Sequence, residues 1–117
     1  MKFGALIGCC SVLLAACLVP SELAKQAEEI SSISAEGALV AHEVGEGDVT
    51  DAFARVHAEA LRKKLSELEP KVQVDALAGL LRNADAGLAL LEEGSVDAGP
   101  VERRLEGIAR QADELAK

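Results

Sequence analysis

The sequence predicts an all-α fold: a small antiparallel up-down bundle of four helices. In four segments the apolar residues recur at alternating intervals of three and four, the pattern of amphipathic helices. Glycine or proline stands at each break, near residues 45–48, 69–71 and 94–99. No segment alternates apolar and polar residues as a strand would. Four such helices with short connections favour an up-down bundle, and 117 residues suit one domain.

The first helix of the bundle is expected to begin at Ser21, an N-cap residue that follows the helix-breaking Pro20. Glu22 then suits the positive end of the helix dipole. Gly45-Glu46-Gly47 ends this helix, because two glycines in three positions favour a chain reversal. The apolar stripe comprises Leu23, Ile30, Ile33, Gly37, Val40 and Val44.

The second helix is capped by Asp48 or Thr50, and Pro70 either terminates or kinks it. Phe53 is expected to be buried and to be its most important core residue, because it is the largest apolar side chain after residue 20. The predicted apolar positions are Val49, Phe53, Val56, Leu61, Leu65 and Leu68.

The third and fourth helices have the most regular spacing. Gly94 is a natural C′ residue, residues 94–99 form a loop, and Pro100 suits the first position of the last helix. The third stripe comprises Val74, Leu77, Leu81, Ala84, Leu88 and Leu91. The fourth comprises Val101, Leu105, Ile108, Ala112 and Leu115.

The first 20 residues have a different character, because the cation Lys2 is followed by an uncharged apolar run that ends in Leu14-Ala15-Ala16-Cys17. This tetrad resembles the lipobox of bacterial lipoprotein signal peptides. The resemblance implies cleavage before Cys17, a diacylglycerol thioether on its sulfur and a fatty acyl chain such as palmitate on the new amino terminus. The expected organisation is a signal peptide at 1–16, a lipidated tether at 17–20 and a helical bundle at 21–117.

Two alternatives to lipidation at Cys17 are open. The tetrad Leu6-Ile7-Gly8-Cys9 also resembles a lipobox, but cleavage there leaves too short an apolar segment for a signal. Residues 3–19 could instead form an uncleaved anchor, although 17 residues are at the lower limit for crossing a bilayer. Cys17 is therefore the preferred site.

The lipobox predicts an exported protein, lipid-anchored to the bacterial cell membrane or the outer membrane and facing outside the cytoplasm. Loss of residues 1–16 removes one cation, Lys2, and changes the net charge from −8 to −9. Such a surface repels phosphate backbones, so nucleic acid is not an expected partner. The expected partners are the membrane, through Cys17, and an unidentified envelope protein.

The residues that usually carry catalysis are sparse. Cys9 and Cys10 leave with the signal peptide, so the mature chain has no free thiol and no disulfide. His42 and His57 are the two histidines, and neither lies in a metal-binding spacing. No nucleophile elbow or phosphate-binding glycine loop occurs. We therefore expect no enzyme activity, no cofactor and no metal.

One polar group could form a site. If the chain reverses at residues 45–47, Glu36 lies level with His57, and Arg55 lies within one turn of them. The simplest interpretation is a cross-helix ion pair or hydrogen bond that sets the register of the hairpin. A ligand-contacting polar patch is the alternative.

Two functions are compatible with these features. The first is a non-catalytic structural or protein-binding module of the cell envelope. The second is a small-ligand or substrate-binding lipoprotein with a site inside the helical bundle, although small core residues and a single aromatic ring make a pocket harder to form.

Overall fold

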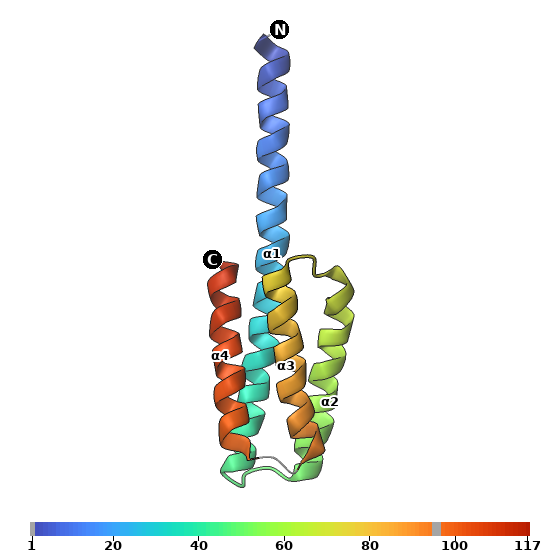
Figure 1. Ribbon diagram of the computed structural model, residues 1–117, viewed down its shortest axis with the longest axis vertical. Coiled ribbons are helices and arrows are strands. Elements are labelled where there is room, and N and C mark those ends of the chain that lie inside the picture. The colour runs from blue at the N-terminus through green and yellow to red at the C-terminus, as the bar shows by residue number, and fades with distance from the viewer. Residues whose placement is uncertain (1, 95–96) are drawn as a thin grey trace.

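The structure, a computed structural model, describes the backbone of residues 2–94 and 97–117 and the side chains of residues 22–94 and 97–117. This part of the chain is all-α and contains no strand. Its elements are α1 (Lys2–Gly45), α2 (Asp51–Leu68), the 3₁₀ turn η1 (Glu69–Lys71), α3 (Asp75–Glu93) and α4 (Ala98–Ala116). Figure 1 shows that consecutive helices run in opposite directions. The predicted all-α fold is confirmed.

Helix α1 sets the length of the molecule. Its 44 residues span about 66 Å at the usual helical rise, close to the longest dimension of 69 Å. The other three helices, of 18 or 19 residues each, surround only its C-terminal part (Figure 1). Helix α4 packs along α1 more extensively than any other pair of elements, and α2 packs mainly on α3.

The start of α1 differs from the expectation. The helix was expected to begin at Ser21 after a break at Pro20, but it runs without interruption from Lys2. An interior proline removes a backbone hydrogen bond and its ring crowds the preceding turn, at a cost of about 3 kcal/mol. The surrounding residues are rich in the strong helix formers Leu and Ala, which favour continuation of the helix. The side chain of Cys17, and with it the predicted lipidation site, lies outside the described residues.

The breaks after α1 and α3 lie where the glycines predicted them. α1 ends at Gly45, and Thr50 caps α2 by accepting a hydrogen bond of 3.1 Å from the backbone N–H of Phe53. α3 ends at Gly94, whose φ of 76° is the left-handed conformation typical of a helix C-terminus. α4 begins two residues before Pro100, at Ala98, so this proline falls inside the first turn rather than at its first position.

Pro70 terminates the second helix. It lies in η1, which follows α2 directly, and α3 begins only at Asp75. The backbone N–H of Val72 bonds to the carbonyl of Glu69 at 3.2 Å and closes the turn. The alternative of two collinear helices with a kink is therefore excluded.

The core lies between all four helices and consists of aliphatic residues. The fully buried large side chains are Ile30, Leu61, Leu65, Leu77, Leu88 and Leu105. Glycine permits a close helix approach at Gly37 of α1, where an added Cβ would lie 2.7 Å from Leu88 Cδ2 and 3.2 Å from Leu105 Cδ1. The predicted stripe positions from residue 77 to 91 and from 101 to 112 are all buried.

The prediction that Phe53 is buried is wrong. Its side chain is 49% exposed, and that of Val56 is 67% exposed. The core stripe of α2 instead consists of Ala54, Ala58, Leu61, Leu65 and Leu68. Its spacing of three and four continues backward from Leu61 to the two alanines, whereas Val56 lies five residues before Leu61, which turns it well away from the core.

The ends of two other stripes are also more exposed than expected. Val74 precedes α3 as its N-cap residue and is 38% exposed. Leu115 lies in the last turn of α4 and is 37% exposed. Both residues stand at an end of their helix.

Candidate functional site

The structure brings Glu36 and His57 together across the first hairpin, as the sequence indicated. Glu36 Oε1 lies 3.9 Å from His57 Nε2, and the two side chains are 47% and 32% exposed. The distance is too long for a hydrogen bond and suits only a weak ion pair when the imidazole is protonated. A role of the pair in setting the register of α1 against α2 stays a prediction, and so does a functional role.

Arg55 does not join this pair. It is exposed and lies two residues before His57 on α2. Two residues correspond to about 200° around a helix, so the two side chains leave α2 on nearly opposite sides. The neighbour of His57 is instead Phe53, whose ring centroid lies 5.6 Å away at an interplanar angle of 66°. This edge-on contact holds the imidazole against an exposed aromatic ring.

The second histidine links α1 to α4. His42 Nδ1 lies 3.1 Å from Glu102 Oε1, within hydrogen-bonding distance, and His42 Nε2 lies 4.0 Å from Glu46 Oε1. His42 is about half exposed. Although two carboxylates face one imidazole here, no group of three His, Cys, Asp or Glu side chains converges on a metal-binding position in the part of the chain that the structure describes.

The best-formed polar cluster was not predicted from the sequence. Arg62 of α2 donates from Nε to Asp85 Oδ1 at 2.9 Å and from Nη2 to Asp85 Oδ2 at 3.3 Å. It also donates from Nη1 to Glu92 Oε2 at 2.6 Å. These bonds, first to Asp85 and then to Glu92, raise the pKa of Arg62 above its already high value. One signal was available: Asp85 and Glu92 are seven residues apart and so lie on one face of α3.

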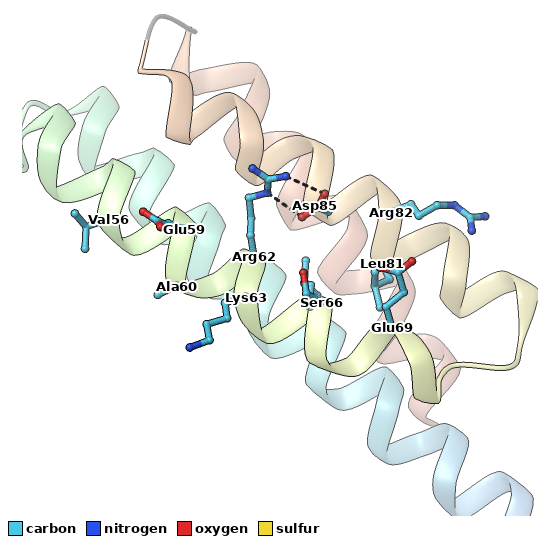
Figure 2. Close-up of a pocket in the computed structure, with 11 residues that line it drawn as sticks. Val56, Glu59, Ala60, Arg62, Lys63, Ser66, Glu69, Leu81, Arg82 and Asp85 are labelled. Atoms are coloured by element: carbon cyan, nitrogen blue, oxygen red, sulfur yellow. Dashed lines mark hydrogen bonds and ion pairs between the residues drawn. The ribbon is translucent and has the colours of Figure 1, made fainter.

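A groove between α2 and α3 runs past this cluster. Its volume is about 880 Å³, and it is open to solvent along its length. Figure 2 shows Arg62 reaching across it to Asp85, whereas Lys63 and Arg82 point away from it. The lining residues are Val56, Glu59, Ala60, Arg62, Lys63, Leu65, Ser66, Glu69, Leu81, Arg82 and Asp85. Because the cations do not converge, the groove is not organised to hold an anion.

Two further polar contacts hold α1 in place. Gln26 donates from Nε2 to the carbonyl of Lys71 at 3.0 Å, and Ser31 donates from Oγ to the carbonyl of Ala109 at 2.9 Å. Ser34 is fully buried in the core, and its hydroxyl has no partner among the described residues. The contact of Gln26 joins α1 to η1, and that of Ser31 joins α1 to α4, so both belong to the packing of the bundle.

Comparison with known protein families, with curated proteins and with solved structures finds nothing that matches this chain. Among the residues whose side chains are described, no helix is both long enough and apolar enough to cross a membrane.

Proposed function

We propose that this protein is a small lipoprotein of the bacterial cell envelope, tethered by lipid on Cys17, and that it acts as a non-catalytic module that binds another protein. The membrane location is inferred from the lipobox Leu14-Ala15-Ala16-Cys17. The binding function is inferred from the exposed apolar face of α2.

The position of Pro20 agrees with processing before Cys17. In a chain that begins at Cys17, Pro20 falls within the first four residues of α1. Backbone N–H groups in the first turn of a helix have no intrahelical partner, so a proline there costs no hydrogen bond. The helix would therefore start at the lipid and continue directly into the bundle, which places the bundle next to the membrane.

The observation that favours protein binding is the exposure of Phe53. It is the only Phe, Tyr or Trp side chain after residue 20, and it stands on the surface rather than in the core. Aromatic side chains bury a large area at the centres of protein interfaces. Val56 is a second exposed apolar residue beside this aromatic ring. Burial of both side chains by a partner would lower the free energy, so this surface suits protein binding.

The alternative, a ligand site inside the bundle, has less support. The space beside Gly37 is filled by the side chains of Leu88 and Leu105. The groove between α2 and α3 lies outside the core and is open to solvent. Neither region supplies the enclosed, mainly apolar cavity that small ligands require.

Mass spectrometry of the membrane fraction tests lipidation at Cys17. The expected product begins at Cys17 and carries the mass of a diacylglycerol and an acyl chain. Several chains are needed for stable anchoring, since one acyl chain alone binds membranes only marginally. Cys17→Ser should abolish the modification, whereas Cys9→Ser should leave it unchanged. An unmodified chain that begins at Met1 would refute the proposal of a lipoprotein.

Photo-crosslinking in cells tests the binding function. A photoreactive residue is placed in the full chain in turn at position 56, at position 39 and at position 115, all of which are exposed. A specific crosslink to one envelope protein from any of these positions supports a binding module. Absence of a protein adduct from every position would refute it.

A further inference from the structure

Helix α2 has a second apolar stripe, which is exposed rather than part of the core. Phe53, Val56 and Ala60 are all exposed, and their spacing of three and four places them along one side of the helix. We call these three residues the α2 outer face. The core stripe of the same helix has its smallest residues, Ala54 and Ala58, at this level. The larger apolar side chains of this half of α2 therefore point outward.

The hairpin that carries the α2 outer face is acidic, whereas the exposed Lys63 and Lys64 follow Ala60 one turn further along the same side of α2. Residues 36–60, which form the end of α1, the connection and the first half of α2, contain six carboxylates and one Arg or Lys residue. The carboxylates are those of Glu36, Glu43, Glu46, Asp48, Asp51 and Glu59. More than half of the net charge of −8 thus comes from this one hairpin. Among the residues whose side chains are described, five large apolar residues are exposed, and the hairpin contains three of them, Leu39, Phe53 and Val56.

The α2 outer face continues into the groove between α2 and α3. Val56 and Ala60 line that groove, which extends along α2 as far as Glu69. The thirteen helical steps from Val56 to Glu69 correspond to about 20 Å, the length of a short helix of a partner. Three carboxylates and three cations line the groove itself, so the electrostatic bias comes from the hairpin end.

We propose that the α2 outer face binds a cationic amphipathic helix of a partner protein, with its apolar side over Phe53 and Val56 and its Lys or Arg residues toward the hairpin carboxylates. This inference rests on the proposed protein-binding function and names the surface and the chemistry of the partner. Charge complementarity selects this occupant. A second copy of the chain would bring two acidic hairpins together, and an anionic lipid surface would be repelled.

The probe is a synthetic helical peptide of about 18 residues with a Leu face and a Lys face, long enough to cover the groove. A peptide with Glu in place of every Lys is its matched control. Each is titrated into the isotope-labelled full chain in micelles of an uncharged detergent, and backbone amide signals are followed by NMR. We expect the Lys peptide to shift the amides of residues 53–60 and the Glu peptide to leave them unchanged.

Variants separate the apolar and the charged contributions. Val56→Ser should weaken binding of the Lys peptide roughly tenfold, because a covered valine contributes about that factor. The control Leu115→Ser, which removes an exposed apolar side chain from α4, should have no effect. Glu36→Gln combined with Glu59→Gln should weaken binding more at low salt than at high salt. The control pair, Asp113→Asn combined with Glu114→Gln, should not.

Several results would overturn the inference. They are the absence of shifts at residues 53–60, an equal response to the Glu peptide, and unchanged affinity in Val56→Ser. Broadening of these signals with protein concentration alone would identify a second copy as the occupant, and binding to phosphatidylglycerol micelles would identify a lipid surface. The proposed function is tested independently of this inference. If the peptide does not bind but crosslinks to an envelope protein arise from position 39 or 115, the inference is wrong and the proposed function stands.

Discussion

The close approach of helices at Gly37 gives a sharp test of the packing. In Gly37→Ala, the new Cβ would lie 2.7 Å from Leu88 Cδ2 and 3.2 Å from Leu105 Cδ1. A contact under 3.0 Å requires the leucine to move, yet Leu88 is fully buried and has little room. Overpacking of a core typically costs about 1–3 kcal/mol.

Alanine also has an intrinsic advantage in a helix, of roughly 0.5–1 kcal/mol over glycine. The matched control is Gly107→Ala in α4, where an added Cβ meets nothing within 4 Å. The intrinsic gain is common to both substitutions and cancels in the comparison. Gly107→Ala should therefore be more stable than the parent, and Gly37→Ala should be less stable than Gly107→Ala by about 1–3 kcal/mol.

The assay is denaturation of residues 21–117 by urea and by heat, followed by circular dichroism, for the parent and both variants. For a domain of this size, a difference of 1 kcal/mol corresponds to roughly 4–8 °C in melting temperature, which a thermal scan resolves easily. Equal stabilisation by the two substitutions would refute the close approach of α1 to α3 and α4. A spectrum dominated by sheet or coil would refute the fold itself.

Three further outcomes are expected. Phe53→Ala should lower the free energy of unfolding by less than about 1 kcal/mol in the same urea assay, because the ring is half exposed. Replacement of a buried leucine by alanine would cost about 2–5 kcal/mol, and a loss in that range for Phe53→Ala would show that the ring is buried. A double-mutant cycle on Arg62→Ala and Asp85→Ala should give a coupling energy near 1 kcal/mol that decreases with added salt, since the bidentate pair is only partly buried. Zero coupling energy at low salt would contradict the ion pair. A cycle on Glu36→Gln and His57→Gln at mildly acidic pH should give less than about 0.5 kcal/mol, because the charges lie 3.9 Å apart and are partly exposed; coupling above 1 kcal/mol would indicate a tighter pair.

The candidate site was only partly predictable. The juxtaposition of Glu36 and His57 follows from the turn at residues 45–47 and the antiparallel pairing of its two helices, both of which are local features. The contact of Arg62 with Asp85 and Glu92 depends on the rotation of α2 relative to α3. That rotation is set by how core side chains interlock, so it cannot be deduced from the spacing in either helix alone.

The sequence by itself determined the helical class, the breaks after α1 and α3, and the core of α3 and α4, whereas it left open whether Pro70 ends or kinks the second helix. These features depend on periodicity and on the backbone preferences of glycine and proline, which act over a few residues. The tertiary structure decided which stripe of α2 faces inward. Two apolar stripes compete on that helix, and a single sequence assigns no depth to either. The bundle buries the alanines, whose small side chains let helices approach closely, and leaves Phe53 and Val56 at the surface.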